Sequence, residues 1–130
     1  MNIPKFALGL VALLGLLVSA VPSSPAVDLT GTWTGSIDTG NMGVDTLTLV
    51  LKKADKGYSG TINDSLALIE KDTAIAEVRW VGNEFSFSFK AMGGAMEFAV
   101  KLTVNGDKMT GQLMNKAEGQ GAPFEFVRKK

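Results

Sequence analysis

The sequence predicts an all-β protein, a single antiparallel up-and-down β-barrel of about eight strands that follows an N-terminal signal peptide. Three observations lead to this prediction. Beyond Gly31, apolar and polar residues alternate, which is the period of a strand with one buried face. Glycine-containing turns separate the alternating runs, as in successive hairpins. Thirteen residues without charge, 6–18, stand near the amino terminus.

The apolar run 6–18 has the length of a signal-peptide core and is shorter than the roughly 20 residues that span a bilayer. Small residues follow it at spacings that suit cleavage after Ala20 ("VSA") or after Ala26 ("SPA"). We expect residues 1–26 to be a signal peptide and 27–130 to be an exported β-barrel domain, periplasmic or extracellular, that does not span the membrane. The alternative is a leader retained as an anchor.

The strand assignment follows the alternation from turn to turn. In "TLTLVL" three leucines alternate with two threonines and a valine, and in "FSFSF" three phenylalanines alternate with serines. Turns with a glycine occur at 54–57, 81–83, 92–94 and 105–107. The expected strands are 31–38, 44–53, 57–63, 73–81, 83–91, 95–104, 107–115 and 122–129.

The segment 64–74 breaks the alternation. Asp64 or Ser65 can cap a helix, and good helix formers follow. The segment is therefore either one helical turn or a loop that crosses one end of the barrel. In the second case its apolar run, 66–69, needs cover from the barrel.

The composition excludes several kinds of chemistry. The chain has neither cysteine nor histidine, so disulfides, thiol catalysis, Ser-His-Asp triads and histidine metal sites are impossible. No serine lies in a GxSxG or SxxK setting, and we expect no enzymatic activity. Asp38, Asn41 and Asp45 lack the spacing of a calcium loop, so no metal or other cofactor is expected.

The charge balance also bears on partners. Removal of the leader takes away Lys5, which leaves 13 − 1 = 12 basic and 13 acidic side chains. A net charge near −1 predicts no nucleic-acid partner.

The lone tryptophan of "GTWTGSI" has a place in a closed barrel. Closure of a meander brings the first and last strands together, so Trp33 should lie near Arg128, whose guanidinium can stack on the indole. Gly31 and Gly35 flank the tryptophan and allow the strand to bend. Gly31, Trp33 and Arg128 are thus the expected barrel-closing residues.

These three residues resemble the structural signature of lipocalins and their calycin relatives: "G-T-W" in the first strand and an arginine in the last. That resemblance implies an eight-stranded barrel that carries a hydrophobic molecule. The longer order "GTWTGSIDTG … LTLVLKK … GYSGTINDS … IAEVRWVGNEFSFSFK … GQGAPFEFVRKK" is similar to a small exported bacterial domain, found alone or ahead of α/β-hydrolase domains. Any hydrolase activity would belong to that other domain.

Two functions remain in view. The first is non-catalytic binding of a small apolar molecule inside the barrel. Its expected ligand-binding residues are Leu47, Leu49, Phe85, Phe87, Phe89, Met96, Phe98, Met109, Phe124 and Phe126. The alternative is an accessory module with a filled core, whose surface binds an exported protein or an envelope polymer.

Exposed apolar side chains would serve that alternative, and Trp80, Met114 and Val50 are its candidates because they lie on faces that otherwise contain polar residues. Glu77 and Arg79 share one face of their strand, where they either point inward or form a solvated pair.

Overall fold

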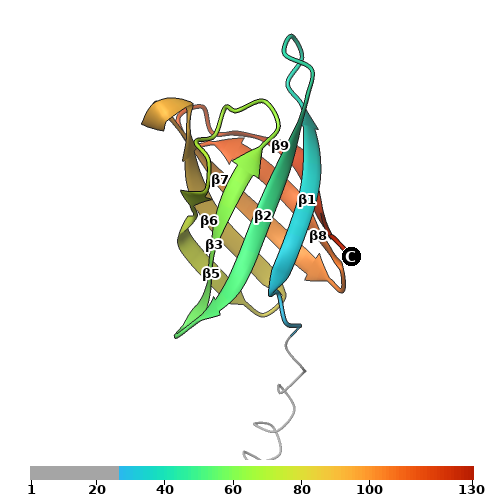
Figure 1. Cartoon of the computed structure of the whole chain (residues 1–130). Coiled ribbons are helices and arrows are strands. Elements are labelled where there is room, and N and C mark those ends of the chain that lie inside the picture. Colours follow the sequence, from blue (N-terminus) through green and yellow to red (C-terminus); the bar gives the residue numbers. More distant parts are fainter. Residues whose placement is uncertain (1–26) are drawn as a thin grey trace, which may run out of the picture.

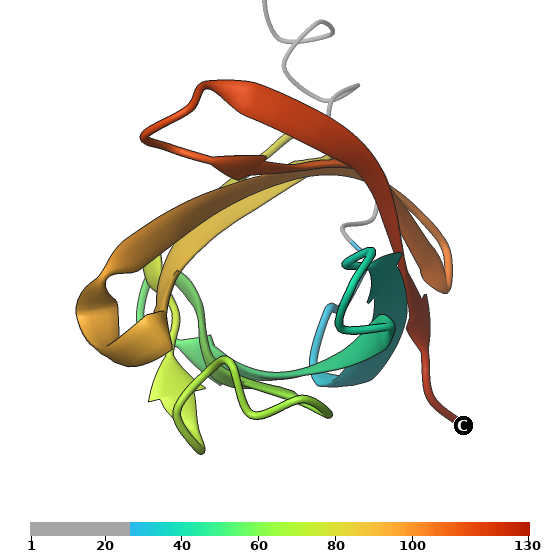
Figure 2. The ribbon, with the colours of Figure 1, turned by 90° about the horizontal axis from the view of Figure 1, so that it is seen from above.

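The computed structural model describes residues 27–130, and the expected signal peptide, 1–26, lies outside the described residues. The described part forms a nearly closed antiparallel up-and-down barrel, as the alternation predicts, with nine strands where eight were expected (Figures 1 and 2). The strands are β1 (Gly31–Asp38), β2 (Val44–Ala54), β3 (Gly57–Asp64), β4 (Thr73–Ala74), β5 (Ala76–Val81), β6 (Glu84–Ala91), β7 (Met96–Asn105), β8 (Lys108–Asn115) and β9 (Gln120–Arg128). A 3-10 turn, η1 (Met92–Gly94), joins β6 to β7. Among residues 27–130, no helix combines the length and the apolar character needed to cross a membrane.

The strand order around the sheet is β4-β3-β2-β1-β9-β8-β7-β6-β5. Almost every strand pairs with its neighbours in sequence, and the pairing of β1 with β9 joins the two ends of the chain. A seam remains between β3 and β5, which pack side by side without being neighbours in the hydrogen-bonded order. The short β4 lies along β3 at this seam and pairs Thr61 with Ala74.

The expected strand 73–81 is divided in two. Ile75 separates β4 from β5, and the pairing of β5 with β6 shifts register between Ala76 and Arg79. Glu77 lies in this bulge with a φ of 52°, a left-handed conformation that side chains other than glycine rarely adopt. A glycine inside a strand often marks a bulge, but β5 contains no glycine. The sequence pattern therefore does not indicate this bulge.

The segment after β3 is a loop across the barrel end, the second of the two expected alternatives, and contains no helix. Ala67 has a φ of 59°, which ends any right-handed turn. Instead of capping a helix, the Asp64 carboxylate accepts hydrogen bonds from the backbone amides of Leu68 (2.9 Å) and Ile69 (3.0 Å). These bonds turn the apolar side chains of the loop toward the barrel, where Ile69 is buried.

Glycine permits close approach of neighbouring strands at three strand positions. A β-carbon on Gly35 would lie 2.2 Å from the carbonyl oxygen of Glu125, and one on Gly60 would lie 2.2 Å from that of Val50. On Gly111 the corresponding distance, to the carbonyl oxygen of Lys101, would be 1.9 Å. Glycines of this kind let strands coil tightly enough to close a small barrel.

Candidate functional site

The barrel has two different ends. We call them the Trp33 end, where the turns 54–57, 81–84 and 105–108 lie, and the cavity end, formed by the β1–β2 hairpin, the loop 65–72, η1 and the β8–β9 turn. The β1–β2 hairpin projects beyond the cavity end, and Figure 2 views the ring of strands along the barrel axis. An eight-stranded barrel can be filled by its side chains or hold one small ligand. This barrel is filled in one half and hollow in the other.

The Trp33 end is closed by packing and hydrogen bonds. The Cζ atom of Arg128 lies 4.3 Å from the centroid of the Trp33 ring, which is fully buried. The indole Nε1 of Trp33 donates to the carbonyl of Leu29 (3.0 Å), so the segment before β1 also covers this end. Gly31 has a φ of 135°, and a β-carbon there would lie 3.4 Å from Nη1 of Arg128. The structure thus brings Gly31, Trp33 and Arg128 together.

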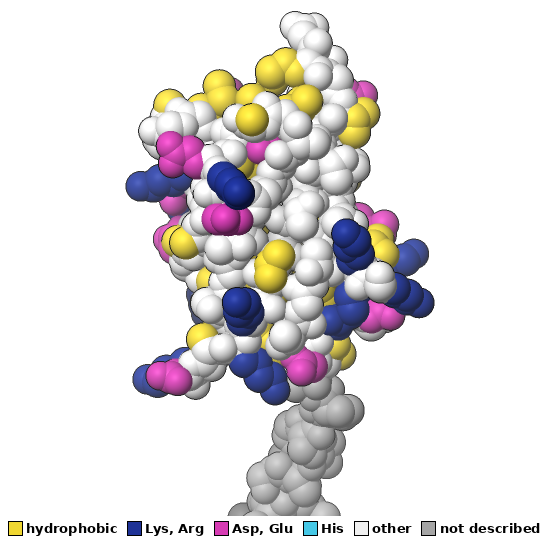
Figure 3. All heavy atoms as spheres, viewed as in Figure 1, with side chains coloured by type: hydrophobic (Ala, Val, Ile, Leu, Met, Phe, Trp, Pro, Cys, Tyr) yellow, Lys and Arg dark blue, Asp and Glu magenta, His cyan; other side chains and the backbone are white. Residues whose placement is uncertain are grey.

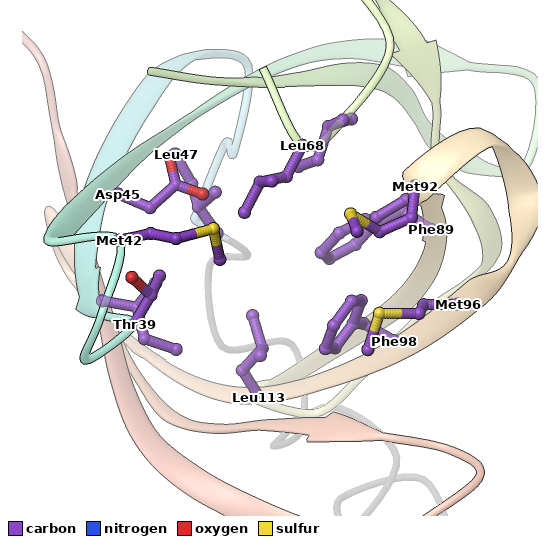
Figure 4. Close-up of a pocket in the computed structure, with 13 residues that line it drawn as sticks. Thr39, Met42, Asp45, Leu47, Leu68, Phe89, Met92, Met96, Phe98 and Leu113 are labelled. Carbon is purple, nitrogen blue, oxygen red and sulfur yellow. The ribbon is translucent and has the colours of Figure 1, made fainter. Parts of the chain in front are cut away.

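The other end contains an apolar cavity of about 270 Å³ (Figure 4). Side chains from β1, β2, β6, β7, β8, η1, the β1–β2 turn and the loop 65–72 surround it. They are Ile37, Thr39, Met42, Asp45, Leu47, Leu68, Ile69, Phe89, Ala91, Met92, Met96, Phe98 and Leu113. The volume is near the lower limit for ligand pockets and fits one small molecule.

The mouth of the cavity is apolar as well. Met42 and Met92, which line the cavity, are exposed by 55% and 50%, although they are hydrophobic. Figure 3 shows a group of hydrophobic side chains at the cavity end with acidic groups beside them, whereas the Lys and Arg side chains lie along the sides of the barrel and toward its other end. The backbone amide of Met92 donates to the carbonyl of Leu68 (2.7 Å), which links η1 to the loop 65–72. Flexible methionine side chains at such a mouth can adapt to molecules of different shape.

Four of the ten expected ligand-binding residues line this cavity: Leu47, Phe89, Met96 and Phe98. The other six lie in the packed part of the barrel and do not line it: Leu49, Phe85, Phe87, Met109, Phe124 and Phe126. Alternation identifies inward-facing residues, but it does not tell how far along the axis each one lies. The loop residues Leu68 and Ile69 were not among the expected residues, since they lie outside the alternating runs.

Among residues 27–130, Asp45 is the one ionisable side chain that lines the cavity, and it is only 4% exposed. Its Oδ1 accepts hydrogen bonds from the amide (3.1 Å) and hydroxyl (3.2 Å) of Ser65 and from the amide of Leu66 (3.1 Å). Burial, together with the neighbouring carboxylate of Asp64, raises the pKa of Asp45 above its ordinary value. Alternation does place Asp45 on the same face as Leu47, so the sequence held a signal for this residue.

The outer face differs from the expected contact surface. Trp80 is half-buried and packs against the core, with its ring 6.2 Å from that of Phe85. The bulge in β5 accompanies this inward position, which corrects the assignment of Trp80 to an exposed contact site. Val50 and Met114 are half-buried on the outer side of their strands.

Glu77 and Arg79 are both exposed, so neither points into the barrel. The carboxylate of Glu77 forms an ion pair with Lys116 (2.6 Å), which also pairs with Glu97 (3.0 Å). The pKa of Glu77 is lowered by its hydrogen bonds with Lys116 and Ser88. This network lies on the outer surface, where ion pairs contribute little to stability.

Within residues 27–130, no three acidic side chains lie close enough together to hold a metal ion. Comparisons of the chain with protein-family models, with curated proteins and with solved structures find no match.

Proposed function

We propose that this protein is a non-catalytic exported barrel that holds one small apolar molecule in the cavity opposite Trp33. The observation that carries the proposal is the cavity itself: about 270 Å³, walled almost wholly by apolar side chains and opening between exposed methionines. Water in such a space finds few hydrogen-bond partners in the apolar walls, so binding of an apolar molecule in its place is favourable. The alternative, an accessory module with a filled core, receives no such support.

We also infer a calycin-type barrel and export by the leader. The stacking of Arg128 on Trp33 at the closed end supports the first inference, and the uncharged run 6–18 supports the second. A connection with domains that precede α/β-hydrolases stays a prediction.

Methionine methyl resonances offer a direct test, because the five methionines of residues 27–130 sample three environments. Met42, Met92 and Met96 line the cavity, Met109 lies in the packed core and Met114 lies on the outer side. We expect titration with octan-1-ol to shift the first three ¹³C-methyl signals at saturation and to leave Met114 in place. Equal small shifts at all five, or none, would contradict the proposal.

A matched pair of variants distinguishes binding in the cavity from nonspecific binding to exposed apolar side chains. Ala91 lines the cavity and is buried, whereas Ala54 is exposed at the Trp33 end of β2. Ala91→Phe should abolish octan-1-ol binding by filling the space, and Ala54→Phe should not change it. Far-ultraviolet circular dichroism would show that both variants keep their strands.

A further inference from the structure

One feature of the cavity does not fit a purely apolar guest. Asp45 places a buried carboxylate in a wall whose other members are apolar, apart from Thr39. Burial of a carboxylate costs free energy unless its oxygens are paired. A polar group in such a place therefore needs a partner in the protein or in a ligand.

Hydrogen-bond donors of the protein reach only one of the two oxygens of Asp45, and its other side-chain neighbour within hydrogen-bonding distance, the carboxylate of Asp64, is itself an acid. Oδ1 accepts the three hydrogen bonds from Ser65 and Leu66, whereas Oδ2 accepts none from residues 27–130. Within the same residues, no fully buried side-chain oxygen or nitrogen lacks a partner. Oδ2 is therefore not fully enclosed, and Figure 4 shows one carboxylate oxygen of Asp45 directed toward the cavity that this residue lines.

The surroundings of Asp45 are short of positive charge. Within residues 27–130, neither Asp45 nor Asp64 forms an ion pair with a lysine or arginine. Asp64 ends β3 beside Asp45, and Asp38 ends β1 nearby, so the ionisable groups at the ends of both neighbouring strands are acids. Two adjacent carboxylates are stabilised by a shared proton or by a cation between them.

We propose that the cavity selects a small amphiphile with a cationic nitrogen head, whose ammonium donates to Oδ2 of Asp45 while its apolar tail lies among the cavity side chains. This inference rests on the proposed function and deepens it. Hydrogen bonds between two charged partners are about twice as strong as neutral ones. Because Asp45 is already buried in the free protein, binding the amine does not require its desolvation anew. A carboxylate or phosphate head would instead meet like charge.

The volume sets the size of the tail. At about 30 Å³ for each water-sized group, a cavity of about 270 Å³ has room for roughly nine such groups. Octylamine, octan-1-ol and octanoate each contain eight carbon atoms, are near this size and have a cationic, a neutral and an anionic head. They are therefore suitable probes for the head-group preference.

The test is calorimetric titration of residues 27–130 with each probe at pH 7, for the wild type and for Asp45→Asn. Asparagine keeps the shape of the side chain and its Oδ1 acceptor but removes the charge. For the wild type we expect octylamine to bind about tenfold or more tightly than octan-1-ol, and octanoate to bind most weakly. Asp45→Asn should lower octylamine affinity about tenfold and leave octan-1-ol affinity within about twofold.

The outcomes distinguish the two proposals. If octan-1-ol binds and octylamine binds no more tightly, or if Asp45→Asn leaves octylamine affinity unchanged, the head-group assignment is wrong and the apolar carrier stands. If none of the three probes binds, the proposed function itself is wrong. Should Asp45→Asn not fold, a pH series on the wild type decides. Octylamine affinity should then fall between pH 7 and pH 4 as Asp45 takes up a proton, with octan-1-ol unaffected. Parallel curves for the two probes would overturn the assignment.

Discussion

The guanidinium of Arg128 lies over the indole of Trp33, with 4.3 Å between Cζ and the ring centroid, and at the same time donates hydrogen bonds to three groups around it. Nη1 donates to the carbonyl of Thr30 (2.8 Å), Nη2 to that of Asp28 (2.9 Å), and Nε to the Asp107 carboxylate (2.8 Å). One planar side chain thus ties β9 to the segment before β1 and to the β7–β8 turn. Lysine cannot reproduce this fork.

We therefore expect Arg128→Lys to lower the free energy of unfolding by about 1–3 kcal/mol, through loss of the carbonyl hydrogen bonds and part of the stacking. Urea denaturation followed by fluorescence would measure the change. Arg79, the other arginine, is exposed and forms no ion pair within residues 27–130, so Arg79→Lys is the matched control and should change stability by less than about 0.5 kcal/mol. Equal losses in both variants would contradict the role given to Arg128.

A pH dependence of stability follows from Asp45. Folding raises its pKa above the ordinary value of 3.8, so above pH 3.8 there is a window in which the folded protein holds a proton that the unfolded chain has lost. This contribution to stability is fully present below 3.8 and is lost as the pH rises through the raised pKa. Relative to Asp45→Asn, the wild type should be more stable at pH 4 than at pH 7.

Thermal melts of the two proteins across this range would provide the comparison. Taking the difference between them removes the contributions of Asp28 and Glu77, whose lowered pKa values give the opposite slope. A difference in melting temperature that stays constant from pH 4 to pH 7 would show that Asp45 titrates as in the unfolded chain.

Gly35 offers a test of how closely β1 and β9 approach. A β-carbon there would lie 2.2 Å from the carbonyl oxygen of Glu125 and 2.7 Å from the ring of Phe124, so the two strands would have to separate. Gly35→Ala should lower the free energy of unfolding by about 1–3 kcal/mol, as expected for an overpacked site. Ser36→Ala, at the exposed position next to it, should be nearly neutral. The prediction fails if chemical denaturation gives the same midpoint for both.

The loop 65–72 depends on Asp64. Its two oxygens accept hydrogen bonds from the backbone amides of Leu68 and Ile69. An asparagine at this position would place an NH₂ group, which cannot accept, opposite one of these two N–H groups. Asp64→Asn should therefore speed hydrogen exchange of the loop amides at least about tenfold, with little change at the Trp33 end. Asp55→Asn, in the exposed β2–β3 turn, serves as the control. Unchanged exchange at Leu68 and Ile69 would show that the packing of the loop alone holds it in place.

The strands and turns of this protein could be predicted from sequence because each is determined locally. In β6, three phenylalanines alternate with serines and face inward as the pattern indicates. In β5, the pattern is interrupted by a bulge whose left-handed residue is Glu77, and nothing in the side chain of a glutamate indicates that conformation. The alternation therefore predicts the outer face of the barrel for Trp80, which in the structure packs against the core.

The cavity was harder to predict because it depends on differences in depth along one apolar face. Phe85 and Phe89 are four residues apart on the same strand and have the same chemistry, yet the first belongs to the packed half and the second lines the cavity. The two phenylalanines differ in the side chains that lie opposite them inside the barrel. At the Trp33 end, an indole and a buried Leu29 fill the space, whereas the turns and the loop at the cavity end leave it open.

The order of the strands has a consequence for how the chain reaches this structure. Nearly all pairings form between segments that follow one another in sequence, but the Trp33–Arg128 pair joins residues 128 − 33 = 95 positions apart. Closing so long a loop costs more chain entropy than forming any hairpin, so this junction should be made last. The two tryptophans would then report different moments of folding. Trp80, in the local β5–β6 hairpin, should change its fluorescence early, and Trp33 only when the ring of strands closes.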